Sequence, residues 1–150
     1  MPISPVFSNL VKFDPSKPIN KPETIQPELA ESWAWDATGT KLTFKLRPGV
    51  KWHDGKPFSA KDVQCTWHML IGKISNEDFR QNPRKIWWQN LSEVTLNGDH
   101  EVTFNLTQPQ PAFLLLLASG YSPVYSCHVP QRDMRTKPVG TGPFKFVEFK

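Results

Sequence analysis

Apolar and polar residues alternate along residues 31–47, which predicts a β-hairpin. The apolar positions of the alternation are Trp33, Trp35, Leu42, Phe44 and Leu46. Pairing Trp35 with Leu42, and therefore Trp33 with Phe44, places the apolar side chains of both strands on one face. The same register sets Asp36 opposite Lys41 and leaves residues 37–40 as the loop. Hydrophobic face, charge pairing and loop length therefore indicate one register.

A second alternation, in residues 93–107, predicts another hairpin. Its apolar positions are Val94, Leu96, Val102, Phe104 and Leu106. A tight turn at Asn97-Gly98 would set Leu96 against Asp99 and Val94 against Glu101. A loop of residues 98–100 instead pairs Leu96 with Val102 and Val94 with Phe104. We predict this second register, because a slip of one residue would bury charge.

A helix is predicted to begin after Ser59, beyond turns at Pro48-Gly49 and Asp54-Gly55. Ser59 is expected to be the N-cap, with Asp62 in place of the glutamate of a capping box. Phe58 and Val63 are spaced for a hydrophobic staple. An apolar stripe then runs to a stop near Gly72, through Val63, Trp67 and Leu70.

The rest of the chain has weaker periodicity. Before the first hairpin we expect a short apolar element over residues 5–13 and an extended proline-rich connector over 14–27. A short helix with a loop is expected over 76–90, and an apolar helix with Pro111 in its first turn over 111–119. The remaining residues are expected to form mixed strand and loop over 121–130, a polar loop over 131–138 and a last strand over 144–149. Together these elements predict a single α+β domain, in which two antiparallel β-hairpins contribute to a sheet flanked by the Ser59 and Pro111 helices.

Composition supports a folded domain and narrows its function. The 150 residues are 38% hydrophobic and 12% aromatic, which is too apolar for a disordered chain. The net charge is +4, but the basic residues are spread along the chain and not gathered in a stripe, so no nucleic-acid partner is expected. The longest apolar run, residues 112–118, is too short to span a membrane. No signal peptide is visible at the N-terminus, which fits a cytosolic protein or a mature or excised piece.

Three motifs offer chemistry but favour structural roles. His53 and Asp54 could be a base and its orienter in a hydrolase, but no nucleophile is placed by the sequence, and neighbours in a turn point apart. The four histidines lack metal-ligand spacing, and no cofactor is expected. The loop Gly140-Thr-Gly142 lacks the residues of a phosphate loop, and we interpret it as a tight backbone crossing.

The segment with the clearest binding character contains Phe79, Arg84, Trp87 and Trp88. Aromatic and arginine side chains on a poorly periodic loop are typical of binding surfaces. The alternative is that a tryptophan fills the core, and we expect at least one of the pair to be buried. A free-standing aromatic module for carbohydrate or nucleic acid would need Trp87 and Trp88 exposed together.

Four stretches resemble the extracellular solute-binding proteins of ABC importers, family 5, which bind dipeptides, oligopeptides or nickel chelates. They are residues 27–33 (PELAESW), 42–63 (LTFKLRPGVKWHDGKPFSAKDV), 102–106 (VTFNL) and 139–144 (VGTGPF). Members of that family are longer, with two lobes that close on a ligand and an extra domain. The resemblance implies that residues 1–150 are this extra domain and that residues 139–150 begin the return to the main lobe.

The resemblance also implies a function. It indicates a non-enzymatic protein that captures a small solute, most simply a peptide, in the periplasm or at the cell surface and delivers it to an ABC permease. The main lobes make most ligand contacts in this family, so residues 1–150 alone are expected to bind ligand feebly or not at all. By position, the extra domain would contribute Phe79, Arg84, Trp87 and Trp88. The stretch 131–137 is short for the family, which implies a trimmed loop.

Cys65 and Cys127 leave two interpretations open, one disulfide or two buried thiols, because the sequence does not fix the compartment. Export, which the resemblance implies, favours the disulfide without excluding a thiol in the core at Cys65.

Overall fold

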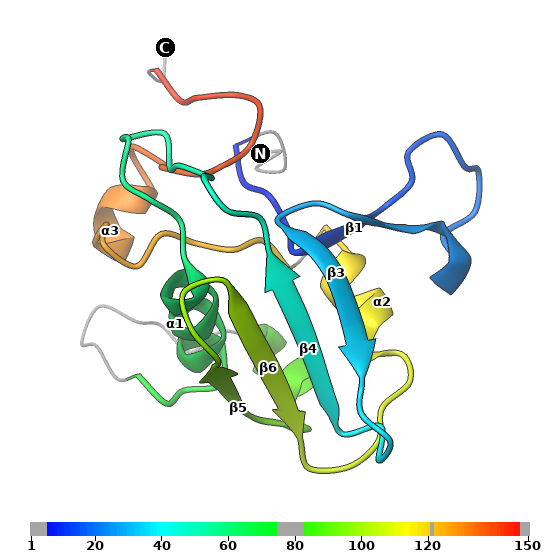
Figure 1. The fold of residues 1–150 in the computed structure, drawn as a ribbon. Helices are drawn as coiled ribbons and strands as arrows, with labels where there is room; N and C mark the ends of the chain where they lie inside the picture. The colour runs from blue at the N-terminus through cyan, green and yellow to red at the C-terminus, as the bar shows by residue number, and fades with distance from the viewer. Residues whose placement is uncertain (1–5, 75–82, 121, 148–150) are drawn as a thin grey trace.

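The computed structural model describes residues 6–74, 83–120 and 122–147. Its centre is a four-stranded sheet in the order β3-β4-β6-β5, in which every pair is antiparallel. The strands are β3 (Ala30–Trp35), β4 (Lys41–Leu46), β5 (Leu91–Leu96) and β6 (Glu101–Leu106). Figure 1 shows the two hairpins side by side, with α1 (Ala60–Leu70) and α2 (Phe113–Ala118) behind them. The predicted α+β class is confirmed.

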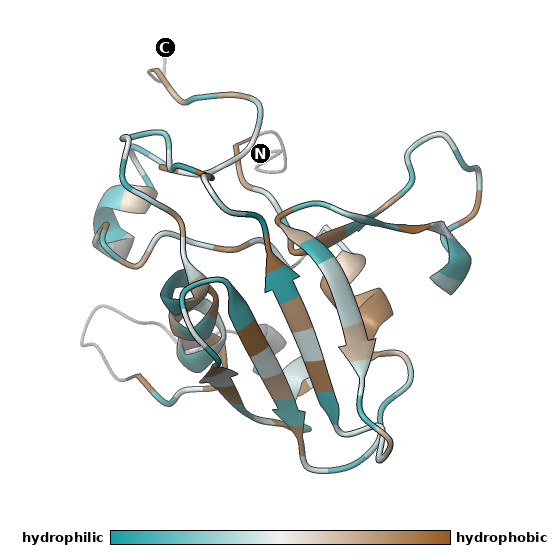
Figure 2. Cartoon of the chain, in the orientation of Figure 1, coloured by the Kyte–Doolittle hydropathy of each residue, from teal (hydrophilic) through white to brown (hydrophobic). Residues whose placement is uncertain are grey.

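Both predicted registers are confirmed. Trp33 pairs with Phe44 and Trp35 with Leu42 in the first hairpin, and the Asp36 N–H donates to the Lys41 carbonyl at 2.9 Å. In the second, Val94 pairs with Phe104 and Leu96 with Val102. The Asn97 N–H donates to the Glu101 carbonyl at 3.0 Å, which leaves residues 98–100 as the loop. The bands of hydropathy along β4 and β6 in Figure 2 are the alternation that set these registers.

The hairpins join through β4 and β6, a pairing that local patterns did not predict. Leu42 pairs with Phe104 and Phe44 with Val102, so the apolar faces of both hairpins become continuous. On the other face, Thr43 and Thr103 share a hydrogen bond of 2.9 Å. The rings of Phe44 and Phe104 meet edge to face at 5.5 Å, a favourable arrangement for aromatic quadrupoles.

The apolar element predicted over 5–13 contains a strand, β1 (Val11–Phe13). Residues 14–27 have more secondary structure than the predicted connector, because they contain the short 3₁₀ helix η1 (Pro22–Thr24) and β2 (Ile25–Pro27). β1 and β2 pair as a separate two-stranded sheet. Leu10 and Val11 are fully buried, so this small sheet is anchored in the main core.

The predicted capped helix is α1 (Ala60–Leu70), with Val63 and Trp67 fully buried. The hydrogen bond at its start runs from the Ser59 backbone N–H to the Asp62 carboxylate, at 3.0 Å. Asp62 also accepts from the Trp52 indole N–H at 3.3 Å. Ser59 is therefore the N-cap and forms a capping box with Asp62, as predicted. Gly72, with a φ of +82°, follows the helix in the left-handed conformation typical of a C-terminal stop.

The predicted apolar helix is shorter than expected. α2 (Phe113–Ala118) begins beyond Pro111, and its Phe113 and Leu117 are fully buried. In the 76–90 segment, residues 75–82 lie outside the described part of the chain, and the rest forms the 3₁₀ helix η2 (Pro83–Trp88).

Two expectations near the C-terminus are wrong. The predicted polar loop over 131–138 contains a short helix, α3 (Gln131–Met134). The predicted strand over 144–149 does not form in its described part, residues 144–147, where Phe144 and Val147 are 66% and 85% exposed. Alternation alone cannot make a strand, because the backbone also needs a neighbouring strand for its hydrogen bonds. No helix among the described residues is long and apolar enough to cross a membrane.

Candidate functional site

The turn at residues 51–57 presents His53 and Asp54 in different directions. It is closed by a bond from the Trp52 N–H to the Lys56 carbonyl, at 2.8 Å, and Gly55 adopts a φ of +87°. Only glycine adopts such a φ without steric cost. Asp54-Gly55 is therefore a turn, as predicted.

His53 is held by the loop that contains Gly140 and Gly142. Its Nδ1 accepts the Gly140 N–H at 3.3 Å, and its Nε2 lies 2.8 Å from the Gly142 carbonyl. Because Nδ1 accepts, the tautomer that satisfies both contacts is neutral with its proton on Nε2. The His53 backbone N–H also donates to the Gly140 carbonyl, at 3.0 Å. We call this set of three contacts the His53 clamp.

Asp54 contacts a different segment of the chain. Its Oδ2 lies 2.6 Å from Nε2 of His128. Partial burial raises the pKa of Asp54, but hydrogen bonds from His128 and from the Lys56 N–H outweigh it and leave the pKa below its ordinary value. His128 carried no signal in the sequence, because its partner is 74 residues away.

This geometry disfavours the hydrolase interpretation. The clamp occupies both ring nitrogens of His53, and Asp54 faces away from that ring. The hollow beside the pair is lined by Lys137, Pro138, Val139, Lys145, Phe146 and Val147, so no serine, cysteine or threonine lines its described part. A nucleophile within reach of a base is the minimum that the reaction requires.

The glycine loop is a backbone crossing, as interpreted from the sequence. The Gly142 N–H donates to the Val6 carbonyl at 2.8 Å. A Cβ added at Gly140 would lie 2.0 Å from the same Val6 oxygen, far inside contact distance. Gly140 therefore allows two backbone segments to touch, and this contact places the loop where His53 can bind it.

The histidines do not converge on a metal. His68 lies on α1, where its Nε2 accepts the Val94 N–H at 3.1 Å, and burial, followed by the charge of Lys73, lowers its pKa. His100 is exposed in the second hairpin loop. In the described ranges, no group of three or more His, Cys, Asp or Glu side chains could hold a metal ion.

The structure separates the two tryptophans of the predicted binding segment. Trp88 is 2% exposed, whereas Trp87 is 40% exposed. The Trp88 ring lies edge to face against Trp67 at 5.9 Å and against Phe113 at 5.7 Å, so it joins α1 to α2. Trp88 is thus the core tryptophan of the pair, and it is withdrawn from the predicted ligand contacts. The carbohydrate or nucleic-acid module, which needs both rings exposed, has no such platform here.

The other two predicted contacts are less defined. Phe79 lies outside the described residues, and Arg84 belongs to η2 by its backbone while its side chain is not described. Trp87 and its neighbour Ile86, which is 65% exposed, give η2 an apolar outer surface.

A hollow of about 380 Å³ adjoins η2, lined by Ile71, Lys85, Ile86, Trp88, Gln89 and Leu91. The Lys85 amino group lies 3.1 Å from the position of a Cβ on Gly72, at the C-terminal end of α1. A cation at that end of a helix is favoured by the helix dipole. The Lys85 side chain of η2 therefore lies over the C-terminal end of α1.

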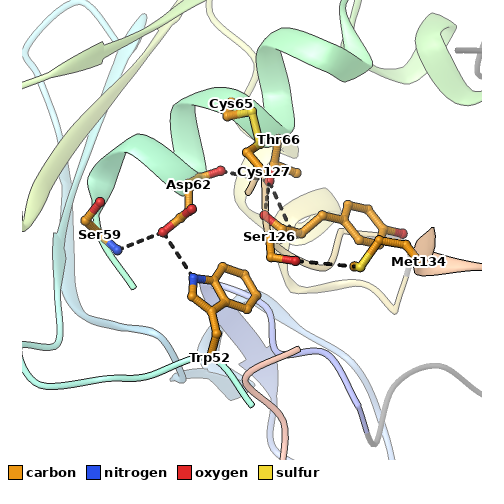
Figure 3. Close-up of a disulfide and its surroundings, with 9 residues drawn as sticks. Trp52, Ser59, Asp62, Cys65, Thr66, Ser126, Cys127 and Met134 are labelled. Carbon is orange, nitrogen blue, oxygen red and sulfur yellow. Dashed lines mark hydrogen bonds between the residues drawn. A yellow bond between two sulfur atoms is a disulfide. The ribbon is translucent and has the colours of Figure 1, made fainter. Parts of the chain in front are cut away.

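A disulfide joins Cys65 of α1 to Cys127, with Cα atoms 6.3 Å apart (Figure 3). Such a separation is within the ordinary range for a disulfide. The bond ties the 122–130 segment to α1, directly before the His128 contact with Asp54. A second hollow beside the bond is lined in part by Met69, Met134 and Arg135, which were not predicted as site residues. The spacing of Cys65 and Met69 by one helical turn was the available signal.

Comparison with known proteins places this fold in a family. The family model of bacterial extracellular solute-binding proteins, family 5 (middle region), matches residues 24–150. The dipeptide-binding protein of Escherichia coli K12 is 30% identical, over 97% of this chain and 30% of its own length. Di/tripeptide-binding protein 3 of Pseudomonas aeruginosa is 33% identical, over 93% of this chain and 29% of its own.

Solved structures give the same result. The dipeptide-binding protein of Pseudoalteromonas sp. SM9913, in complex with Met-Leu, superposes with a TM-score of 0.80 at 25% identity, over 97% of this chain and 32% of that protein. NikZ of Campylobacter jejuni, in complex with Ni(L-His), gives a TM-score of 0.80 at 29% identity, over 99% of this chain and 28% of that protein. The chain thus spans about 30% of the length of these curated relatives. It belongs to the bacterial extracellular solute-binding proteins of family 5.

Proposed function

We propose that this protein takes part in the capture of a small peptide or a related solute outside the cytoplasm, in the periplasm or at the cell surface, for delivery to an ABC permease. The observation that carries the proposal is the family match over residues 24–150. Peptide ligands are favoured because relatives from Escherichia coli, Pseudomonas aeruginosa and Bacillus subtilis are named as dipeptide-, di/tripeptide- and oligopeptide-binding proteins.

We further propose that residues 1–150 act as one domain of a two-lobed binding protein, with residues 139–150 leading back to a main lobe. Two observations support this division. The chain covers about 30% of the length of its relatives, and the hollow beside η2 is small and open. The role is binding and not catalysis, in keeping with relatives that are named as binding proteins.

Within this domain, the proposed ligand contacts are Trp87, Arg84 and Phe79. The argument is strongest for Trp87, because it is 40% exposed on a helix that the buried ring of Trp88 holds against Trp67 and Phe113. A rigidly held aromatic ring at a surface contributes contact area at little cost in conformational entropy. Trp88 acts on the ligand only indirectly, by positioning η2.

Calorimetric titration with dipeptides and oligopeptides tests the proposal. We expect the 150-residue chain to bind them no more tightly than the micromolar range, and the product of the complete reading frame that contains it to bind far more tightly. In that product, Trp87→Ala should weaken binding by about tenfold, as for a moderate interface anchor. Ile19→Ala, at a remote residue that is 57% exposed, is the matched control.

The possible failures separate the parts of the proposal. Sub-micromolar binding by residues 1–150 alone, or a reading frame that stops at Lys150, would overturn the division into domains. A longer product that binds no peptide would overturn the peptide assignment. Equal affinities for the Trp87→Ala and Ile19→Ala variants would remove Trp87 from the site.

A further inference from the structure

A second hollow, of about 390 Å³, opens beside the Cys65–Cys127 disulfide. Apolar side chains from three parts of the chain line it, and they are Met69, Ile74, Tyr125, Val129, Pro130 and Met134. Its volume lies near the lower limit of small-molecule sites, which run from roughly 300 to 1,000 Å³. The hollow therefore has room for one short apolar group of a ligand.

The walls of this hollow are held in place by specific contacts (Figure 3). The disulfide fixes Cys127 to α1. One residue further along α1, the Thr66 hydroxyl accepts the Tyr125 N–H at 3.1 Å. The Met134 sulfur accepts from the Ser126 hydroxyl at 3.6 Å and from the Val139 N–H at 3.5 Å. The site is therefore largely pre-formed, which lowers the entropic cost of binding.

The charge at the hollow is positive. Arg135 is the one charged residue in its described lining, where no carboxylate occurs. The nearest acidic residue in sequence, Asp133, is already within 3.6 Å of Arg132. Arg135 is exposed and has no ion pair with any residue in the described ranges. A guanidinium at the edge of an apolar hollow suits a ligand that carries a carboxylate beside an apolar group.

We propose that this hollow binds a small amphipathic carboxylate, with its apolar chain between Met69 and Met134 and its carboxylate on Arg135. The site is separate from the peptide capture proposed above and does not depend on it. Two sources share this chemistry, a free aliphatic or aromatic acid and the C-terminal residue of a peptide with an apolar side chain.

Methionine methyl signals provide a direct test, because the chain has only 3 methionines and two of them line the hollow. The protein is labelled with ¹³C-methyl methionine, and the signals are assigned with Met69→Leu and Met134→Leu. Octanoate is expected to shift the Met69 and Met134 signals in a saturable manner. Octanol should bind about tenfold more weakly and octylammonium more weakly still, because each lacks the charge-assisted bond to Arg135.

Variants and peptides complete the test. Arg135→Gln should weaken octanoate binding by about tenfold, whereas Arg132→Gln, a matched loss of charge in the adjacent helix α3, should leave it unchanged. Gly-Gly-Leu as a free acid, compared with its amide, distinguishes the peptide source from the free acid. The proposal is overturned if neither octanoate nor the tripeptide acid shifts the two signals at millimolar concentration. It is equally overturned if octanol matches octanoate, or if Arg135→Gln has no effect.

Discussion

The Nε2 atom of His53 lies 2.8 Å from the carbonyl oxygen of Gly142, a residue 89 positions further along the chain. With the Gly140 N–H on its other nitrogen, the ring joins the turn after the first hairpin to the loop that leads to the C-terminus. The histidine is therefore a structural link, and its neighbour Asp54 makes a separate link to His128.

Replacing His53 should destabilise the fold without creating or removing any activity. His53→Ala removes two hydrogen bonds to the glycine loop, and we expect the free energy of unfolding to fall by about 1–3 kcal/mol. Urea denaturation measures this loss. His100→Ala, at an exposed histidine in a hairpin loop, is the control and should change stability by less than about 0.5 kcal/mol. Equal losses for the two variants would mean that the two ring contacts of the His53 clamp contribute nothing.

Gly140→Ala should be far more harmful than Gly120→Ala. The new methyl group would lie 2.0 Å from the Val6 oxygen at Gly140, whereas nothing lies within 4 Å of that position at Gly120. Because the obstacle is backbone, relief requires the 140–142 loop to move, and we expect a loss of about 3 kcal/mol or more in the free energy of unfolding. Thermal or urea unfolding of the pair decides the matter, and similar stabilities would contradict the close crossing.

The two neighbouring tryptophans should respond differently to truncation. Trp88→Ala removes a buried ring that contacts Trp67 and Phe113, and should cost about 3–5 kcal/mol in unfolding free energy. Trp87→Ala should cost about 1 kcal/mol, because its ring is partly exposed. Urea denaturation of both variants tests the division. A larger loss for Trp87→Ala would reverse our assignment of core and surface.

The sequence predicted correctly those parts of the fold that depend on residues close together in the chain. Each hairpin register follows from the alternation around a short loop, and Val63 and Trp67 follow from helical spacing. The β4–β6 pairing was not predicted, because it joins segments that are far apart in sequence. The strand expected over 144–149 failed for a related reason, since alternation does not supply a pairing partner.

The candidate site was predictable only in part. The sequence drew attention to Trp87 and Trp88 as a pair, but which ring is buried depends on how η2 packs against α1 and α2. The contact of Asp54 with His128 and the hollow beside the disulfide each require tertiary structure that no local motif encodes.

Opening the disulfide should weaken the fold but not abolish it. Cys65 and Cys127 are 62 residues apart, and a cross-link over such a loop stabilises by about 2–4 kcal/mol, mainly by restricting the unfolded chain. We expect the Cys65→Ala/Cys127→Ala variant to lose this amount in urea denaturation and to be insensitive to dithiothreitol. The unaltered protein should fall to the stability of the variant when it is reduced. Equal stability of the oxidised and reduced protein would show that the bond adds nothing.

Asp54 should give the fold an acid-sensitive contribution to stability. The net effect of its environment lowers its pKa from the ordinary value of 3.8, although partial burial acts in the opposite direction. A carboxyl group whose folded pKa is depressed stabilises fully above its unfolded pKa, and the contribution is lost as the pH falls through the folded pKa. Asp54→Asn should therefore be less stable than the unaltered protein at pH 7, by up to about 1 kcal/mol for so accessible a pair.

The difference between these two proteins should shrink as the pH falls below 3.8, because protonated Asp54 no longer has the charge that His128 and the Lys56 N–H favour. Urea denaturation at several pH values measures this convergence. Asp99→Asn, in the second hairpin loop, serves as the control and should show no such convergence. The stability difference between the Asp54→Asn variant and the unaltered protein could instead stay constant from pH 7 to pH 3. In that case the contribution of the Asp54–His128 contact to stability would not depend on the charge of Asp54.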